Sequence, residues 1–415
     1  MLYDVIIVGG GIAGFYTAYK LQSMYKDMNI LLLEKQSKKY IGGRTGNDTF
    51  AGVNVVNGAG IGRKKDKRLI QLCKELHVHY SEAVLNPHYA STVNPINVNE
   101  VMGYLKKVYT NDYTGPPTTF KDFASYILGE EIYNRLVITN GYSDYEDEDA
   151  HDVIFHYGME DNTCCLKYLS IPWKKLILAL ASHIKKNVHI QFSTKVIQIE
   201  KQYDQLHKIT CENETAYFTK KVIIATTITS IHKLLPDYPI YNQIHSQPFL
   251  RLYGKFSKSS ALIMKSFVPT YTIVPFPLQK LIPMDPDKGV YMIAYSDNNN
   301  AMILKNILEN TPTNRELFCR LIEKALGIQP NTLILLQMAD YYWNVGTHYY
   351  SPLVGYKTRK DFIHHAQHPT PDINVVGEVV SEDQGWTEGA LSSVDCVINS
   401  KWGKERGKDI FKKRT

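Results

Sequence analysis

The chain has 415 residues, of which 44% are hydrophobic and 21% charged, and its formal net charge is +6. This length suits two domains, and because no apolar run approaches the ~18 residues of a membrane span and the chain opens on a strand rather than a secretory signal, we expect a soluble, cytoplasmic protein. Six cysteines without CxxC spacing argue against a disulfide scaffold or a metal site, and a net charge carried mostly by residues 401–415 gives no reason to expect nucleic acid as a partner.

The first expected element is a buried strand at residues 3–8, whose near-continuous apolar run is typical of a strand covered on both faces. Gly9, Gly11 and Gly14 follow in GxGxxG register and lead into a helical pattern. The first glycine permits the tight turn, the second lets the backbone approach a pyrophosphate, and the third lets the helix pack on the strand. N–H groups at the start of the helix, around Ala13, are then expected to bind phosphates.

A second strand, at residues 30–33, ends in Glu34, 20 residues after Gly14. A dinucleotide-binding fold needs a carboxylate at this place to accept hydrogen bonds from ribose hydroxyls. The same carboxylate disfavours NADP, because it would repel the 2′-phosphate. Strand, glycines, helix, strand and acid in this order predict a dinucleotide site with much higher specificity than a lone GxGxxG.

A second glycine pair, Gly42 and Gly43, precedes Arg44, and residues 57–60 read Asn-Gly-Ala-Gly. Here the sequence resembles the GG-doublet flavoproteins, in which this pair approaches the cofactor and the arginine reaches its pyrophosphate. The resemblance implies FAD, with Gly43 and Arg44 in those roles. Asn57 departs from the usual aspartate, because it keeps an acceptor but loses the charge.

Two charged segments follow in the chain. Residues 63–68 are mostly basic, and we expect an exposed segment that leads into a helix ending at residues 77–79. The acidic run at residues 144–149 is interpreted as a solvated loop, with attraction of a cationic substrate as the alternative.

Strand patterns return at residues 190–192, 195–199 and 221–226, and residues 249–256 are expected to start a second return to the other domain. A closing motif at residues 375–391 runs into a helix that continues through Val397. The basic tail, residues 401–415, is expected to be a solvated helix end or a frayed terminus, with a contact to acidic lipid or polymer as the alternative.

These motifs together resemble the flavin-dependent amine oxidase family, which includes monoamine, polyamine and L-amino-acid oxidases and histone-demethylase relatives. The resemblance covers nearly the whole chain and is dense at residues 3–80, 190–230 and 341–398. It implies an α/β fold with a Rossmann-like FAD-binding domain of the GG-doublet type and a discontinuous α+β substrate domain. The expected FAD-binding domain comprises residues 1–80, 185–247 and 345–400, and the expected substrate domain comprises residues 81–184 and 248–344.

The same resemblance implies a set of cofactor-binding residues. The main chain at Val196 would hold the adenine, and the closing motif would embrace the pyrophosphate and the flavin ring. The full predicted set is Gly9, Gly11, Ala13, Gly14, Glu34, Gly43, Arg44, Gly58, Ala59, Val196, Gly377, Glu378, Trp386 and Thr387. Ser393 stands where a glycine is usual, and we expect this change to affect helix packing.

In that family an amine C–H passes a hydride to flavin N5, the imine hydrolyses, and dioxygen reoxidises the flavin. The resemblance therefore implies a small-molecule amine and O2 as reactants. Two aromatic rings frame the amine in the family, since their quadrupoles favour an electropositive group. Trp386 and Tyr349 match these two places, with Tyr349 read as part of a loop.

Two departures from the family affect the expected chemistry. His348 lies where monoamine oxidases attach FAD through a cysteine, so we expect non-covalent FAD, with a histidyl linkage as the alternative. Arg251 aligns with the lysine that holds a water at flavin N5, and an arginine cannot lose its proton. Three interpretations of Arg251 therefore stay open. It weakens the reactivity of the flavin towards oxygen, it binds a substrate carboxylate bidentately, or it is an ordinary surface or core-edge arginine.

The sequence leaves three functions open. The leading interpretation is an FAD-dependent amine oxidase or dehydrogenase whose catalytic candidates are Trp386, Tyr349 and Arg251. The second is an amino-acid oxidase or desaturase-type enzyme on the same scaffold. The third is a protein that keeps the fold but has lost turnover and acts in binding or assembly. A homodimer is compatible with each of them.

Overall fold

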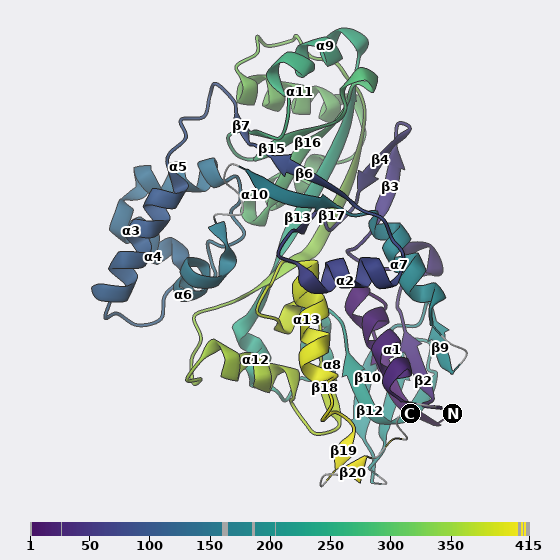
Figure 1. Cartoon of the computed structure of the whole chain (residues 1–415). Coiled ribbons are helices and arrows are strands. Elements are labelled where there is room, and N and C mark those ends of the chain that lie inside the picture. Colours follow the sequence, from purple (N-terminus) through teal and green to yellow (C-terminus); the bar gives the residue numbers. More distant parts are fainter. Residues whose placement is uncertain are drawn as a thin grey trace.

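The computed structural model describes residues 2–25, 27–159, 165–184, 187–203, 205–405, 408–409 and 411. Two large sheets organise these residues (Figure 1). The seven-stranded sheet has the order β10-β11-β12-β1-β2-β9, and β18 also pairs with β12. Its strands are β1 (Leu2–Val8), β2 (Ile30–Leu33), β9 (Val188–Gln191), β10 (Val196–Lys201), β11 (His207–Cys211), β12 (Ala216–Ile224) and β18 (Ile373–Val375).

The centre of this sheet is parallel and covered on both faces. β1 runs parallel to β2 and β12, and its apolar residues alternate between two core clusters on opposite faces. One face is covered by α1 (Ile12–Met24), α2 (Lys67–Glu75), α7 (Trp173–Ser182) and α13 (Thr387–Val397), and the other by α8 (Ile228–Leu234) and α12 (Arg359–Gln367). A strand buried on both faces needs such a continuous apolar run.

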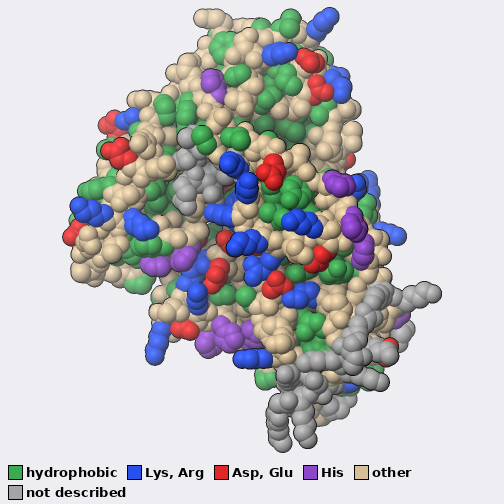
Figure 2. All heavy atoms as spheres, in the orientation of Figure 1, with side chains coloured by type: hydrophobic (Ala, Val, Ile, Leu, Met, Phe, Trp, Pro, Cys, Tyr) green, Lys and Arg blue, Asp and Glu red, His purple; other side chains and the backbone are tan. Residues whose placement is uncertain are grey.

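Ion pairs join three of these helices at the surface. Asp395 of α13 accepts hydrogen bonds from Lys20 of α1 at 2.5 Å and from Arg68 of α2 at 2.8 Å. Figure 2 shows basic and acidic side chains intermingled over this part of the molecule. The last turn of α13 is thereby held next to the C-terminal half of α1 and the first turn of α2.

The six-stranded sheet has the order β17-β13-β16-β15-β14-β7 and is antiparallel except for the β14–β7 pair. Its strands are β7 (His88–Tyr89), β13 (Ile244–Phe256), β14 (Thr272–Ile273), β15 (Lys280–Asp285), β16 (Val290–Asp297) and β17 (Leu335–Tyr350). Its apolar face packs against α9 (Lys258–Phe267), α10 (Asn298–Leu304) and α11 (Pro312–Leu326). These helices lie at the top and centre of Figure 1.

A separate helical lobe has its own apolar core. It contains α3 (Val98–Asn111), α4 (Phe120–Leu128), α5 (Glu130–Asn140), α6 (Ala150–Asp152) and a π-helix, η2 (Val153–Tyr157). Smaller elements complete the described chain: β3 (Asn47–Phe50) with β4 (Val53–Val56), β5 (Gly62–Arg63), β6 (Ser81–Leu85) and β8 (Leu166–Ser170), the hairpin β19 (Lys404–Glu405) with β20 (Lys408–Asp409), and 3-10 turns at Lys38–Tyr40, Pro239–Gln243, Pro286–Lys288, Lys305–Ile307 and Glu378–Val380.

The structure has two features that the division into domains expected from the sequence does not include. α7, which lies within the segment expected to face the substrate, packs into the core under α1. β13 and β17 pass without interruption through the expected boundaries at residues 247 and 345. Residues 341–350 form part of a 16-residue strand, so reading Tyr349 as part of a loop was wrong.

Three expectations about charged segments were wrong in part, although Lys64, Lys65, Lys67 and Asp147 are exposed as expected. Arg63 and Asp66 are 4% and 1% exposed and bind each other at 2.8 Å. Within the acidic run, Glu148 and Asp149 are buried. The tail is neither a helix end nor frayed at Trp402 and Phe411, whose side chains pack with Tyr25 in the core, whereas Arg406, Lys412, Lys413 and Arg414 lie outside the described residues.

In the described part of the chain, no helix has both the length and the apolar character of a membrane span.

Candidate functional site

The glycine motif forms an open cradle between β1 and α1. Gly9 has φ +112°, and a Cβ there would collide with the carbonyl oxygen of Ala225. A Cβ on Gly14 would collide with the carbonyl oxygen of Gly9, so this glycine permits close packing of helix on strand. Around Gly11, by contrast, no described heavy atom lies within 4 Å of where a Cβ would be. The space over Gly11 is therefore open to a ligand.

The N-terminus of α1 is suited to an anion. Its N-cap, Gly11, offers no side chain to the first N–H groups, and the first turn contains no acidic residue. These groups carry the positive end of the helix dipole and need acceptors. Ala13 lies in this turn and is 6% exposed. Phosphate oxygens satisfy such a terminus directly.

Glu34 lies at the carboxyl end of β2, beside the cradle. Its Oε2 accepts a hydrogen bond from Gly10 N–H at 2.6 Å, and its Oε1 accepts one from Gln36 N–H at 2.7 Å. Each carboxylate oxygen has a second lone pair. Glu34 can therefore hold the loop in place and still accept hydrogen bonds from a ribose.

The glycine pair reaches the cradle from the other side. Gly42 forms a parallel bridge with Gly11, and the nearest described atom to a Cβ on Gly43 would be the Cα of Gly11, at 3.8 Å. Arg44 donates to the carbonyl oxygen of Gly346 at 2.7 Å and to Glu378 at 3.1 Å. The arginine predicted to reach a pyrophosphate is thus anchored to the opposite wall of the site.

Glu378 is the acceptor on which this wall converges. Its carboxylate accepts from the backbone N–H of His348 at 2.8 Å, from His348 Nδ1 at 2.6 Å, from Gly385 N–H at 2.9 Å and from Arg44. Burial alone would raise the pKa of Glu378, but His348, Arg44 and the N–H donors together hold it well below its usual value. Glu378 is therefore an ionised, fully engaged carboxylate.

His348 is a neutral imidazole with a defined tautomer. Burial lowers its pKa, although Glu378 opposes this effect. Its Nε2 accepts a hydrogen bond from Ile228 N–H at 3.1 Å, so the ring proton lies on Nδ1 and is donated to Glu378. Both ring nitrogens are engaged and the side chain is 0% exposed.

Arg251 is a buried residue of β13 rather than a surface arginine. It is 2% exposed, and its Nε donates to the carbonyl oxygen of Gly58 at 2.7 Å. Its guanidinium lies 4.2 Å from the ring centroid of Tyr295, and its Nη2 would be 2.8 Å from a Cβ on Gly60. Arg251 therefore lies against the Gly58–Gly60 segment.

The remaining predicted cofactor residues lie in the same region or at the edge of the sheet. Ala59 N–H donates to the carbonyl oxygen of Arg44 at 2.8 Å. Val196 is half-buried at the start of β10. Thr387 is the first residue of α13.

Ser393, which the sequence presented only as a departure, has a defined structural role. Gly377 has φ +123°, and its N–H donates to Ser393 Oγ at 2.7 Å. Ser393 is 1% exposed. The hydroxyl group thus ties the turn after β18 to α13, an interaction that the usual glycine cannot make.

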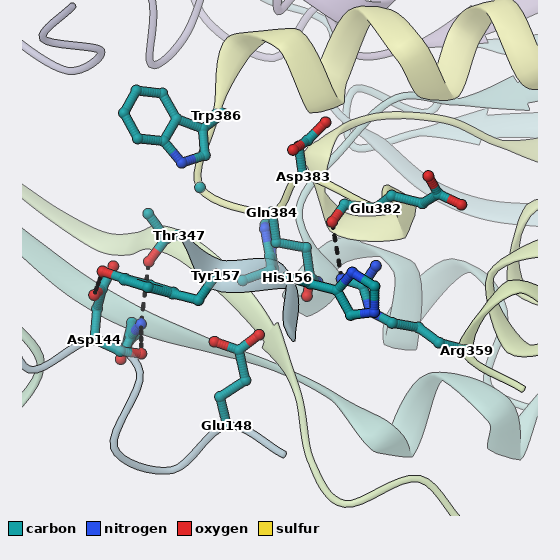
Figure 3. A pocket seen from close by; sticks show the side chains of 13 residues that line it. Asp144, Glu148, His156, Tyr157, Thr347, Arg359, Glu382, Asp383, Gln384 and Trp386 are labelled. Carbon is teal, nitrogen blue, oxygen red and sulfur yellow. Dashed lines mark hydrogen bonds between the residues drawn. The ribbon is translucent and has the colours of Figure 1, made fainter. Parts of the chain in front are cut away.

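A small cavity of about 20 Å³ adjoins this wall (Figure 3). Asp144, Glu148, His156 and Tyr157 line it from the helical lobe, Gln247, Thr347 and His348 from the sheet, Arg359 from α12, and Glu382, Asp383, Gln384, Gly385 and Trp386 from the closing motif. Of these residues the sequence predicted only Trp386 as catalytic. The acidic run was the one signal that could have indicated the others.

The two predicted aromatic rings differ in their positions. Trp386 lines the cavity, and its ring lies 3.9 Å from the guanidinium of Arg63. Tyr349 is absent from the described lining, and its ring lies 5.5 Å from that of His245. Thr347 and His348 are the residues of β17 that line the cavity, and Thr347 Cγ2 would lie 3.7 Å from a Cβ on Gly385.

One group of side chains near the cavity has the donor types of a metal site. His151, Asp152 and His156 offer donor atoms within 4.8 Å of one another. Asp152 already accepts a hydrogen bond from Arg359 Nε at 2.7 Å. Because this buried guanidinium carries a positive charge next to the carboxylate, we assign no metal ion to the group.

The comparisons with known proteins agree with this architecture. A family model described as an NAD(P)-binding Rossmann-like domain matches residues 7–76. Wild-type putrescine oxidase bound to putrescine has a similar structure, with a TM-score of 0.72 at 12% identity over 95% of this chain and 98% of that one. A putative protoporphyrinogen oxidase from Exiguobacterium sp. 255-15 gives 0.67 at 14% identity over 95% and 97%. No curated protein matches the sequence.

At these identities the similarity is one of fold. The chain has the fold of these oxidases over nearly its whole length, with a Rossmann-like nucleotide-binding region and a second, mixed region. The fold class expected from the sequence is confirmed, as is the resemblance to the flavin amine oxidases at the level of fold.

Proposed function

We propose that this protein binds FAD non-covalently and oxidises the C–N bond of a small amine to an imine, with O2 as the electron acceptor. The observation that carries the proposal is the open cradle over Gly11. A Cβ at Gly11 would contact no described atom, and the N-terminus of α1 beside it has no side-chain cap. The fold shared with putrescine oxidase supports the choice of reaction class.

The residues around the cradle fit a flavin dinucleotide. The N-terminus of α1 and the Gly42–Gly43 backbone would hold the pyrophosphate, and Glu34 would accept from a ribose. Gly58 and Ala59, backed by Arg251, would lie along the ring system. FAD supplies the two-electron acceptor of the reaction when it is bound.

The protein's own residues would bind and orient the amine. Trp386 offers an aromatic face at the cavity, which suits an electropositive nitrogen. The wall formed by Glu378, His348 and Arg44 fixes the position of Gly385, and hence of the tryptophan that follows it. Glu378 and His348 are buried, whereas Arg44 and Trp386 are half-buried.

Two observations bear on the alternatives. Both ring nitrogens of His348 are hydrogen-bonded inside the protein, which supports a non-covalent cofactor over a histidyl linkage. Arg251 donates its Nε to Gly58 and lies on an aromatic ring, so it is less available for a substrate carboxylate than an unengaged arginine. This favours an amine over an amino acid.

Absorbance of the purified protein tests the cofactor. Flavin absorbance between about 350 and 500 nm should remain in solution after the protein is precipitated. A coloured precipitate would instead indicate covalent attachment, and colourless protein that does not take up added FAD would refute the proposal.

Peroxide release then tests the reaction. Mono-, di- and polyamines and L-amino acids should be compared with the same flavin-loaded protein. We expect peroxide with at least one amine. Turnover of L-amino acids alone would favour the amino-acid oxidase, and no turnover despite stoichiometric flavin would favour the protein that has lost activity.

A further inference from the structure

A buried charged cluster lies behind the loop at residues 141–149. Asp297 Oδ1 accepts from the backbone N–H and the Oγ of Ser143, at 3.0 and 2.6 Å, and from Gln279 Nε2 at 2.9 Å. Asp297 Oδ2 is also buried but has no hydrogen-bond partner among the described residues. The cluster therefore contains a buried carboxyl oxygen that no described donor satisfies.

Lys280 completes this cluster. It is 0% exposed, its Nζ lies over the rings of Tyr142 and Tyr295 at 2.8 and 4.1 Å from their centroids, and the described part of the chain gives that nitrogen no hydrogen bond. Burial lowers the pKa of Lys280, against the opposing effect of Asp297 and Asp144. Burying a charged lysine without a hydrogen-bond partner is costly unless a nearby opposite charge compensates it or the amine becomes neutral.

Asp144 connects the buried cluster with the cavity. Its side chain lines the cavity that contains Trp386, and its Oδ1 accepts a hydrogen bond from Tyr157 O–H at 2.5 Å (Figure 3). Its backbone oxygen accepts from Gln247 Nε2 at 2.5 Å, which fixes the loop against β13. The carboxylate is thus held in place at the cavity wall.

The surroundings give Asp144 an unusual proton affinity. Burial and the neighbouring Asp297 raise its pKa to about 7, while Tyr157 and Lys280 act in the opposite direction. Burial and the neighbouring Asp152 also raise the pKa of Glu148, on the same wall, despite Arg359. With a pKa of about 7, Asp144 is a cavity carboxyl that can exchange a proton near neutral pH.

Other charged groups face the same cavity. Burial and Arg359 lower the pKa of His156, which leaves that imidazole neutral near pH 7. Glu382 is exposed, and Asp383 lies 3.6 Å from Arg63. These groups lie on the closing motif and on η2, whereas Asp144 is the carboxyl backed by the buried lysine.

We propose that Asp144 accepts the proton that an alkylammonium substrate must lose before its C–N bond can be oxidised, with Tyr157 and Lys280 as positioning residues. This inference rests on the proposed function. In the step, one N–H bond of the ammonium breaks and an O–H bond forms on the carboxylate. The electron pair of the broken bond stays on nitrogen as its lone pair, so the step needs no oxidant.

The need for such a base follows from ordinary amine chemistry. An alkylammonium has a pKa near that of lysine, about 10.4, so only about one molecule in 1000 is neutral at pH 7.4. An ordinary aspartate, at about 3.9, is a poor acceptor for that proton. A half-buried carboxyl with a pKa of about 7 is a better one, and partial burial favours two neutral groups over an ion pair.

The first test compares Asp144→Asn with Asp147→Asn, the same change at an exposed position of the same loop. With flavin-loaded protein and benzylamine or putrescine, wild-type kcat/KM should rise as pH increases through about 7. Asp144→Asn should lower kcat/KM at pH 7.4 by about 100-fold or more. Its pH profile should also lack the rise near pH 7, the acidic limb of the profile, because kcat/KM should then increase with the concentration of neutral amine up to higher pH. Asp147→Asn should stay within about twofold of wild type.

Variants of the two positioning residues should shift the acidic limb of the same kcat/KM profile. Tyr157→Phe and Lys280→Met each remove a group that favours ionised Asp144, so each should move the limb to higher pH. An unchanged limb in both variants, or a limb that survives Asp144→Asn, would overturn the proposal. Flavin absorbance at wild-type level shows that a variant is folded.

A binding experiment separates this inference from turnover. Calorimetry with putrescine at pH 8 in phosphate and in Tris buffer measures the protons released on binding. Wild-type protein should release close to none, because Asp144 keeps the proton, whereas Asp144→Asn should release about one if it binds the neutral amine. Equal release by both proteins, or no amine binding by the wild type, would refute the role of Asp144. Absence of peroxide with every amine, despite binding, would refute the proposed function instead.

Discussion

The glycine cradle and the cavity wall are built in opposite ways. The cradle comes from residues 9–14, 34 and 42–44, so it lies within one short segment whose glycines are required by local backbone geometry. The cavity wall brings together Asp144, Gln247, Thr347 and Trp386, which are spread over residues 144–386 of the chain. The glycine cradle can therefore be recognised in the sequence as a motif. The cavity wall forms only when two sheets and a helical lobe pack together.

The largest effect is expected where the cradle should bind its ligand. Gly11→Val places a side chain in space that contains no described atom, so the fold should tolerate it. That same space is where the backbone should approach the pyrophosphate. We expect FAD affinity to fall by at least about 100-fold, measured by fluorescence titration of flavin-free protein.

A matched control is available in the helical lobe. Gly103 lies on an exposed turn of α3, and no described atom lies within 4 Å of where a Cβ would be. Gly103→Ala should leave both FAD affinity and Tm near wild type. Normal flavin binding by Gly11→Val would show that the cradle is not the cofactor site.

The second effect concerns the wall that joins the two regions. Glu378→Gln replaces a carboxylate that accepts from four donors with an amide that has one accepting oxygen. His348 cannot compensate by changing tautomer, because its Nε2 is the acceptor for Ile228 N–H. We expect the free energy of unfolding, measured in urea, to fall by about 3 kcal/mol. The exposed neighbour Glu382→Gln should change it by less than about 0.5 kcal/mol.

The stability difference between wild type and Glu378→Gln should depend on pH in a definite direction. The folded-state pKa of Glu378 is lowered, so the stability it contributes is present above the unfolded-state value of about 4.3 and is lost as pH falls further. The difference should accordingly be largest above about pH 5 and should narrow in acid. A difference that widens as pH falls would mean that Glu378 is protonated in the folded state.

The sequence indicated the fold well because the fold depends on short-range patterns. Residues 3–8, the glycines after them and Glu34 each have a local reason, and the helix through Val397 ends where it was expected. The sequence did not show that Asp144 faces a cavity or that Arg63 lies against Trp386 and Asp383, because both arrangements depend on partners far along the chain. The acidic run was read as solvated since a charge in a sequence carries no information about the hydrogen bonds that compensate its burial.

A third, smaller effect tests a residue that the sequence showed only as an exception. Ser393→Ala removes the acceptor of Gly377 N–H without opening a large cavity. A buried N–H left without a partner costs about 1–2 kcal/mol, so the urea midpoint should fall with no change in the slope. Ser392→Ala, one residue earlier in α13, should cost much less because Ser392 Oγ only donates to the carbonyl oxygen of Gly389 within the helix.

The smallest effect should distinguish the two aromatic rings that the sequence placed together. Trp386 lines the cavity and Tyr349 packs beside His245, so only the first is positioned to face an amine there. Because an aromatic face contributes about 1 kcal/mol to binding a cation, Trp386→Leu should lower kcat/KM for an amine roughly five- to tenfold. Tyr349→Leu should change kcat/KM by less than about twofold in the same assay, even if it lowers Tm slightly by removing a packed ring. Equal losses in the two variants would mean that β17 presents Tyr349 to the substrate after all, and that the cavity wall changes when an amine binds.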